Sequence, residues 1–504
     1  MVQRVFSSNC GGGGGDRSNR DLSYESAVFH LNSLQSNSMT IKKVRERRSI
    51  KPETNLEETA QFLKTLGIEV NQLDNLKIIH VSGTKGKGST CAFVESILRE
   101  LGFKTGFYSS PHLVHVRERI RLNSVPISEE LFAQNFFEVY DVLRASVDSI
   151  SAMPAYFKFL TLLSFHIFLK EKVDVAVMEV GIGGEFDCTN VIPNPTVCGI
   201  TTLDYDHVSM LGTTLPEIAW HKAGIMKKDS ICIGVEQPAE AMKIIEQRAK
   251  DRECQFYATP KINQYQFPSN HLDSILPGHH QMTNLSLALQ LVRIWLERTN
   301  NNDSLPALKL SLPSKTKILP GYSVPKEFLD GLKKCSWKGR GQILKKENIT
   351  FFLDGAHTPK SLAFCNEWYS ENHQPSSKST DKIFQVLLFT CTSDRNPTTL
   401  LPTLKDTGFD IALFSTTRLK PAIDKHLDST NLNASENEQR EKCEANQKCW
   451  KELTGKDKIE IYDCISDALD RIQELSKNNQ QVHVLVTGSL HLVGGVLSFL
   501  DPSV

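Results

Sequence analysis

A chain of 504 residues can build two hydrophobic cores of ordinary size, or at most three. Its hydrophobic fraction of 40% is typical of a globular protein, and its formal net charge of +0 argues against a nucleic-acid or anionic-membrane partner held by bulk electrostatics. The longest apolar run, near Phe159, is far shorter than the ~20 residues of a membrane span. The 12 cysteines include no Cys-x-x-Cys pair, so neither a zinc module nor a disulfide framework is expected.

Residues 1–22 are expected to lie outside the folded domains. They contain arginine and serine, with no acidic residue before Asp16, which is typical of a weak mitochondrial presequence. A disordered tail is the alternative, because the glycine run that begins at Gly11 opposes a continuous amphipathic helix. We expect a cytoplasmic protein with a mitochondrial fraction.

Residues 23–313 are predicted to form the first domain. Helices are expected at 23–35, 55–68, 89–102 and 156–171, and strands at 76–82, 103–110, 173–180 and 196–203. Alternating helices and buried, β-branched strands predict a mostly parallel sheet flanked by helices, as in P-loop ATPases.

The second half of the chain repeats the α/β alternation. Residues 314–336 are rich in proline, glycine and lysine, and we interpret them as an interdomain linker. Residues 337–504 follow as a smaller, Rossmann-like α/β domain. Within it, the polar stretch near 425–456 is expected to be a disordered insert.

The stretch IIHVSGTKGKGSTCAF (78–93) places a glycine-rich turn between a buried strand and an apolar helix. Free backbone N–H groups and the helix dipole favour an anion at such a turn, and Lys87 adds positive charge for nucleotide phosphates. Ser89 or Thr90 is placed to contact a phosphate or its metal. The usual pattern ends in Gly-Lys-Ser/Thr, whereas here Gly88 follows the lysine. A nucleotide site is predicted, in an unusual form.

Two further strands end in side chains that suit a phosphate site with a metal. Glu179 ends an apolar strand, at the carboxyl edge of the sheet where ligands of α/β folds bind. A carboxylate at this edge is able to hold Mg²⁺ beside phosphates. Asp204, Asp206 and His207 follow the next strand. Since Mg²⁺ seldom binds histidine, chemistry alone does not favour His207 as a ligand.

Arginines at period two are candidates for binding an anionic substrate. Arg117, Arg119 and Arg121 would share one face of a strand, where guanidinium groups bind carboxylate or phosphate. A solvated basic edge strand is an equal alternative. Several other polar residues near strand ends or in helices are ambiguous alone: Lys222, Arg340, Asp354 and His357.

The motifs together resemble one family. In order, they are HVSGTKGKGST, SSPHLVHVRERIRLN, VMEVGIGGEFDCTN, DHVSMLG with IAWHKAGIMK, GHHQMTNLSLAL, WKGRGQ and LDGAHTP. This order is that of the Mur ligase superfamily, and the wording is similar to its eukaryotic folylpolyglutamate synthase branch from about Tyr24 to the C-terminus. Gly-Thr-x-Gly-Lys-Gly-Ser is that superfamily's own phosphate loop, so Gly88 belongs to it.

The resemblance implies an ATP-dependent amide ligase whose substrates are reduced folates and L-glutamate. We expect the chain to be a monomer. ATP would phosphorylate the terminal γ-carboxylate of a folate, giving an acyl phosphate and ADP. The α-amino group of glutamate would then displace phosphate, because a carboxylate is a poor electrophile until it carries a leaving group. The reaction would take place between the domains, where closure excludes water.

The resemblance also implies roles for individual residues. The ATP phosphates would be bound by Gly83, Thr84, Lys85, Gly86, Lys87, Gly88, Ser89 and Thr90, adenine by Asn284, phosphate also by Arg340, and ribose by Asp354. One or two Mg²⁺ ions would be held by Ser110, Glu179, His207 and Lys222, the lysine as a carbamate formed with CO₂. Catalysis is assigned to Lys87, Lys222 and His207, and the carboxylates of glutamate or folate to Arg119, His357 and Ser489. His221 departs from the usual neutral residue before the lysine.

Three other readings stay open. The first is a dihydrofolate synthase, which joins glutamate to dihydropteroate. The second is a nucleotide-binding homologue without ligase chemistry. The retained Lys87, Glu179, His207 and Lys222 argue against it. The third is a kinase that acts on a small acid.

Overall fold

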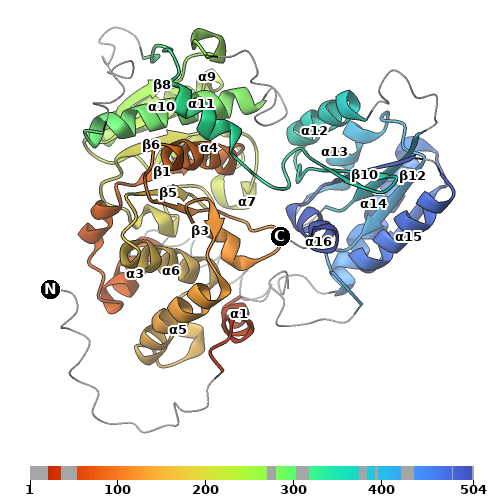
Figure 1. Cartoon of the computed structure of the whole chain (residues 1–504), viewed down its shortest axis with the longest axis horizontal. Coiled ribbons are helices and arrows are strands. Elements are labelled where there is room, and N and C mark those ends of the chain that lie inside the picture. Colours follow the sequence, from red (N-terminus) through yellow and green to blue (C-terminus); the bar gives the residue numbers. More distant parts are fainter. Residues whose placement is uncertain are drawn as a thin grey trace.

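The computed structural model describes residues 21–35, 54–268, 280–301, 317–373, 383–391, 395–421, 436–479 and 481–501. Two α/β domains lie side by side, and each contains one sheet with helices on both faces (Figure 1). This architecture confirms the predicted two-domain α/β class. The expected tail over 1–22 falls outside the described residues except for its last two. Within the described ranges, no helix is long and apolar enough to cross a membrane.

The first sheet is mostly parallel. Its strands are β1 (Ile79–Ser82), β2 (Thr105–Tyr108), β3 (Ile120–Leu122), β4 (Val125–Pro126), β5 (Val175–Glu179), β6 (Val197–Ile200), β7 (Ile231–Gly234) and β8 (Gln255–Ala258). Their spatial order is β4-β3-β2-β5-β1-β6-β7-β8, with only β3 and β4 antiparallel to their neighbours. Every residue of β1, β5 and β6 is buried, as expected for strands covered on both faces.

Helices cover both faces of this sheet (Figure 1). One face carries α1 (Tyr24–Ser33), α3 (Thr54–Thr65), α5 (Glu129–Ala145) and α6 (Tyr156–Lys170), and the other carries α4 (Lys87–Glu100), α10 (His280–Arg298) and α11 (Lys326–Lys333). The remaining helices of this domain are α7 (Val208–Leu211), α8 (Leu215–Ala223) and α9 (Ala239–Asp251), with 3₁₀ turns η3 (Val70–Leu76), η4 (Val116–Arg119), η5 (Ile150–Ala152), η6 (Cys188–Val191) and η7 (Ile262–Gln264). Ser23 caps the start of α1, because Ser26 N donates to Ser23 Oγ at 3.2 Å.

The second sheet is smaller and has the predicted Rossmann-like character. Its strands are β9 (Gln342–Lys346), β10 (Ile349–Leu353), β11 (Ile383–Phe389), β12 (Ile411–Ser415), β13 (Ile459–Tyr462) and β14 (Gln481–Thr487), in the order β13-β12-β11-β14-β10-β9. Only β9 is antiparallel. One face packs against α12 (Pro359–Asn372), α13 (Pro397–Leu400), η9 (Leu401–Leu404) and α14 (Glu436–Thr454), and the other against α15 (Ile465–Lys477) and α16 (Leu490–Leu500).

The prediction that residues 314–336 form an interdomain linker is wrong for residues 317–336, which the structure describes. Leu319 and Phe328 are fully buried in the core of the first domain. Ser96 Oγ on α4 also donates to Gly331 O on α11 at 2.7 Å. Proline and glycine here shape turns and a short helix that cover the first sheet, so the chain leaves this domain only at Trp337.

The expected disordered insert near 425–456 is also corrected. Residues 436–454 form α14, which buries Cys443 and Trp450 against the second sheet. The helix is polar on its other side, which is why its composition alone looked unable to fold. The first part of the insert, 425–435, lies outside the described residues.

A substitution at Trp450 tests whether α14 packs against the second sheet. Trp450→Ala is expected to destabilise the second domain by about 3–5 kcal/mol, because a fully buried aromatic side chain is lost. Urea unfolding followed by circular dichroism measures the change. Lys451→Ala, at an exposed position of the same helix, is the matched control and should shift stability by no more than about 0.5 kcal/mol. Equal effects of the two variants would contradict the burial of α14.

Candidate functional site

A cavity of about 1200 Å³ lies at the carboxyl ends of the strands of both domains. Fifteen of the predicted site residues line it: Thr84, Lys85, Gly86, Lys87, Gly88, Ser89, Ser110, Arg119, Glu179, His207, Asn284, Arg340, Asp354, His357 and Ser489. The other three, Gly83, Thr90 and Lys222, are not part of its wall. Residues far apart in the sequence therefore meet at one site.

The phosphate loop has the predicted strand, turn and helix. Gly86 is the N-cap residue of α4, with φ +89°, and it has no side chain that could accept a hydrogen bond from the first turn. The first backbone N–H that is bonded within the helix is that of Thr90, which donates to Gly86 O at 2.8 Å. The N–H groups of the first turn are thus available to an anion beside the helix dipole. Thr90 is fully buried, whereas Ser89 lines the cavity.

Two glycines of the loop allow close contacts that a side chain would block. A Cβ on Gly86 would lie 2.0 Å from Asn284 Oδ1. A Cβ on Gly88 would lie 2.8 Å from Trp337 Cζ2. Trp337 also packs on Phe107, with ring centroids 5.5 Å apart. The extra glycine of the motif thus makes room for the tryptophan at which the chain leaves the first domain.

Lys222 lies behind the phosphate loop. Its side chain is 4% exposed, and its Nζ donates to Gly83 O at 2.7 Å. Burial, together with the nearby Lys87 cation, holds the pKa of Lys222 well below its usual value. A neutral amine is the form that reacts with CO₂, so the environment suits the carbamate that the resemblance implies.

The residues expected to hold a metal suit an ion that also binds phosphates. Glu179 is 5% exposed and accepts from Ser110 N at 3.1 Å. Burial raises the pKa of Glu179, although the Lys87 cation opposes the shift. His207 lines the same cavity with a side chain that is 42% exposed. Among the described residues no group of three acidic, histidine or cysteine side chains forms a closed metal site. One carboxylate and open positions fit Mg²⁺, which keeps waters and binds substrate phosphates.

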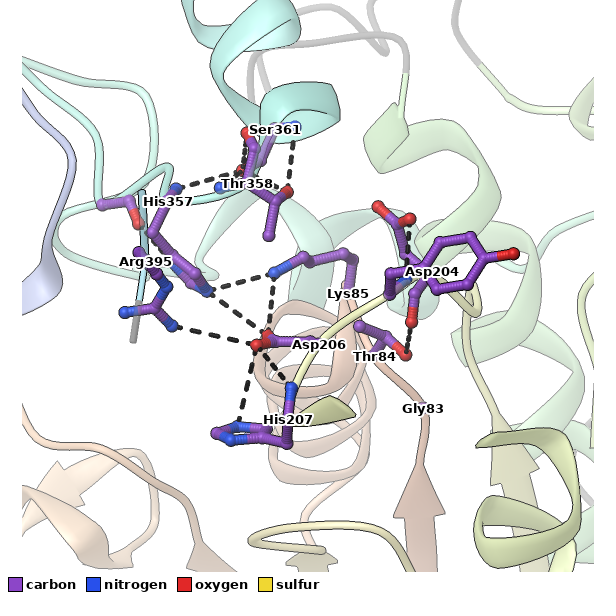
Figure 2. A network of polar contacts seen from close by, with 12 residues as sticks. Gly83, Thr84, Lys85, Asp204, Asp206, His207, His357, Thr358, Ser361 and Arg395 are labelled. Carbon is purple, nitrogen blue, oxygen red and sulfur yellow. Dashed lines mark hydrogen bonds and ion pairs between the residues drawn. The ribbon is translucent and has the colours of Figure 1, made fainter. Parts of the chain in front are cut away.

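A charged cluster joins the two domains across the cavity. Figure 2 shows the Asp206 carboxylate of the first domain between Lys85, His357 and Arg395. Its Oδ2 lies 3.2 Å from Lys85 Nζ and 3.8 Å from His357 Nε2, and its Oδ1 lies 3.9 Å from Arg395 Nη2. Since His357 and Arg395 belong to the second domain, this carboxylate attracts that domain toward the phosphate loop.

Proton positions in this cluster follow from its contacts. His357 Nδ1 donates to Gly355 O at 2.7 Å, so its Nε2 is free to accept from Lys85 Nζ at 3.0 Å. Burial and the neighbouring cations lower the pKa of His357 to about 4, and burial lowers the pKa of Lys85 to about 8. Burial alone would raise the pKa of Asp206, but the Lys85 cation holds it below its usual value. A neutral imidazole and an ionised carboxylate are therefore the stable forms.

The three arginines do not share one strand face, which corrects the sequence expectation. Arg119 belongs to η4 and Arg121 to β3, so the alternation of a strand is lost between them. Arg119 Nε donates to His112 Nδ1 at 2.9 Å in the cavity wall. Arg121 stacks on the Trp337 ring at 4.9 Å, and Arg117 lies 4.0 Å from Glu129. Of the three arginines, only Arg119 lines the cavity.

The second domain contributes a short turn and a helix start. Gly341 N donates to Asp354 Oδ2 at 2.8 Å, which fixes the segment of Arg340 against the end of β10. Ser489 caps α16, accepting from His491 N at 3.2 Å. Desolvation and the Arg119 and Arg395 cations lower the pKa of His491 to about 4. The start of α16 thus lines the cavity with a neutral imidazole.

Several residues of this site have no role that the sequence predicts. For Asp206 the sequence offers one signal, its position at a strand end beside His207. Arg395 and His491 have no such signal, because only the meeting of the two domains brings them to the cavity. Trp337 stands in the WKGRGQ motif, but its contact with Gly88 is a property of the fold.

A phosphate loop that faces a second α/β domain across a charged cavity defines a two-domain nucleotide-binding protein. The family model for the C-terminal domain of dihydrofolate synthetase matches residues 339–499. The Bos taurus protein named folylpolyglutamate synthase, mitochondrial, is 38% identical, covering 96% of this chain and 93% of its own. A Caenorhabditis elegans protein that carries the folylpolyglutamate synthase name provisionally is 48% identical, covering 94% and 92%. The chain belongs to the folylpolyglutamate synthase family.

Solved structures show the same fold. The Mycobacterium tuberculosis folylpolyglutamate synthase complexed with ADP and AMPPCP matches with a TM-score of 0.68 at 22% identity, over 94% of this chain and 99% of that one. The Thermotoga maritima folylpolyglutamate synthase matches with a TM-score of 0.64 at 27% identity, over 89% and 94%.

The contact between Gly88 and Trp337 gives a prediction. Gly88→Ala should weaken nucleotide binding by about tenfold, because the new methyl group displaces either the loop or the tryptophan. Calorimetric titration with ADP and Mg²⁺ measures the dissociation constant. Adding Trp337→Phe to Gly88→Ala should recover part of the affinity, with Trp337→Phe alone as the control. An unchanged affinity in Gly88→Ala would show that the contact has no influence on the loop.

Proposed function

We propose that this chain is an ATP-dependent ligase that adds L-glutamate to the terminal γ-carboxylate of reduced folates. The observation that carries the proposal is the shared cavity, in which a phosphate loop of one domain faces cationic and hydrogen-bonding groups of the other. Membership of the folylpolyglutamate synthase family gives the substrates, since relatives at 38% and 48% identity over nearly the whole chain carry that name.

The site residues divide the chemistry between them. The first-turn N–H groups of α4 and the Lys87 cation bind the phosphates of ATP, and Arg340 approaches them from the second domain. A folate γ-carboxylate oxygen attacks the γ-phosphorus, and the bond to the β-phosphate oxygen breaks, which releases ADP. The α-amino nitrogen of glutamate then attacks the acyl carbon, and phosphate and a proton leave. Closure of the cavity protects the acyl phosphate from water.

Ser110, Glu179 and His207 would hold Mg²⁺, which neutralises charge on the phosphates. The Lys222 carbamate would offer a carboxylate for a second ion. Arg119 is oriented by His112 and is our candidate for a substrate carboxylate, together with His357 and Ser489. His357 has the weaker claim among these, because its Nε2 already accepts from Lys85.

We also propose a monomer that resides in the cytoplasm with a mitochondrial fraction. Both domains contribute to one cavity within a single chain, so no second copy is needed to complete the site. The Bos taurus and Homo sapiens relatives carry "mitochondrial" in their names, which supports the second location. Light scattering of the purified protein and subcellular fractionation test the two statements.

The ligase assay is incorporation of labelled glutamate into tetrahydrofolate with ATP and Mg²⁺. Lys87→Ala should reduce the rate by about a thousandfold or more, because it removes the cation that balances the transferred phosphate. The circular dichroism spectrum should stay unchanged, since Lys87 lines the cavity. Lys64→Ala, on the exposed side of α3, is the matched control and should retain the full rate. Full activity in Lys87→Ala would exclude its phosphate role.

The same assay separates the alternative activity. A family model named for dihydrofolate synthetase matches the second domain, which favours dihydropteroate as the competing acceptor. We expect incorporation with tetrahydrofolate and none with dihydropteroate. Incorporation with dihydropteroate alone would replace the proposed function, and ATP consumption without an amide product would indicate a kinase.

Lys222 gives a separate prediction. Lys222→Ala should lose at least about a hundredfold in rate, and added formate should restore part of it by standing in for the carbamate carboxylate. The measurement is the initial rate across a formate titration, with the wild-type protein as the control. An alanine variant with the wild-type rate would dismiss the carbamate.

A further inference from the structure

Two residues of the first domain complete the apolar core of the second. The cluster formed by β10, β11, β12, β14, α15 and α16 also contains Val114, which is 7% exposed, with Leu113 packed against it. Both come from the loop between β2 and β3 in the first domain. We call Leu113 and Val114 the plug. The two domains therefore share packed side chains as well as a cavity.

Helix α16 is shaped to receive the plug. It lies on the side of the second domain that faces the first (Figure 1). A Cβ on Gly494 would lie 1.8 Å from Leu113 O, so only glycine lets the helix backbone meet the loop backbone. On its other side, Leu113 Cδ2 would lie 2.9 Å from a Cβ on Gly339. The plug is thus held between α16 and Gly339, the residue before Arg340.

The loop that carries the plug is internally braced. The Glu118 carboxylate, 8% exposed, accepts three backbone N–H groups: from Leu113 at 3.0 Å, from Val114 at 2.8 Å and from His115 at 2.7 Å. Hydrogen bonds to an ionised, buried acceptor are stronger than neutral ones. The loop is therefore expected to move as one body.

Both ends of this braced loop carry residues of the cavity. Ser110 lies three residues before the plug, and its N–H donates to Glu179 Oε2 at 3.1 Å. Arg119 lies just beyond Glu118, and its Nε donates to His112 Nδ1 at 2.9 Å. A shift of the plug would shift both of these groups relative to the phosphate loop.

The helix that holds the plug also begins in the cavity. Ser489 caps α16, and His491 in its first turn lines the cavity. Gly494 contacts the plug on the next turn. One rigid helix therefore links the cavity wall of the second domain to the loop of the first.

We propose that Leu113 and Val114 are positioning residues through which the second domain sets the places of Ser110 and Arg119 in the cavity. Their roles in binding Mg²⁺ and substrate rest on the proposed function, whereas the contact itself does not. A change in the angle between the domains must then move these two groups together with α16. Closure of the domains and assembly of the site are one event.

Two neighbouring glycines of α16 provide a matched test. Gly494→Ala pushes on Leu113 of the first domain, whereas a Cβ on Gly495 would lie 2.2 Å from Ile465 Cδ1, within the second domain. Both changes overpack the same helix, so a general loss of stability should affect both. Hydrogen–deuterium exchange of the peptide 110–119, with thermal unfolding alongside, separates the two effects.

Gly494→Ala should speed exchange over 110–119 by about tenfold, and Gly495→Ala by no more than about twofold. In the ligase assay, Gly494→Ala should raise the Mg²⁺ concentration for half the maximal rate by about fivefold, with no such change in Gly495→Ala. If Gly494→Ala does not fold, Leu113→Ala is measured against Gly495→Ala with the same expected results.

Two outcomes overturn the inference: equal exchange over 110–119 in both variants, or an unchanged Mg²⁺ requirement in a variant that exchanges faster. The exchange measurement uses the protein without substrates. A wild-type protein that fails to incorporate glutamate therefore contradicts the proposed function and leaves the exchange test in force.

Discussion

The whole site depends on unpaired N–H groups at the first turn of α4. An anion can approach them only if the chain leaves β1 in a tight turn and if nothing fills the space above the helix. Asn284 and Trp337 press on the turn where Gly86 and Gly88 have no side chain. Behind it, Lys222 bonds the carbonyl of Gly83. The turn is thus fixed from three directions before any ligand arrives, so that little ordering remains to oppose binding.

Charge balance gives the cavity its second property. The chain as a whole is neutral, yet Lys85, Lys87 and Arg340 line the same cavity. Asp206 offsets part of this positive charge and holds groups of the second domain near the loop. A triphosphate would compete with this carboxylate for the same cations. The cavity therefore keeps positive charge that can bind an anion. While no anion is bound, the Asp206 carboxylate limits the repulsion between these cations.

Much of this could be predicted from local sequence. The strands before Gly83 and at Glu179 are short and wholly buried, and their carboxyl ends must meet at one edge of a parallel sheet. Contacts between domains could not be predicted, because nothing local pairs Arg395 with Asp206 or Leu113 with Gly494. The prediction of a disordered insert in place of helix α14 was wrong for another reason. Its buried Cys443, Asn446 and Trp450 have helical spacing, but the abundance of charged residues between them masked that signal.

The plug also bears on where one domain ends. The chain leaves the first domain at Trp337, yet the apolar interior of the second domain includes Val114. A fragment that began after Trp337 would expose the surface that the Val114 side chain covers. The second domain is therefore continuous in sequence, but its apolar core includes side chains from the first domain. Fusion of the second domain to an unrelated protein would succeed only if that protein supplied replacements for Leu113 and Val114.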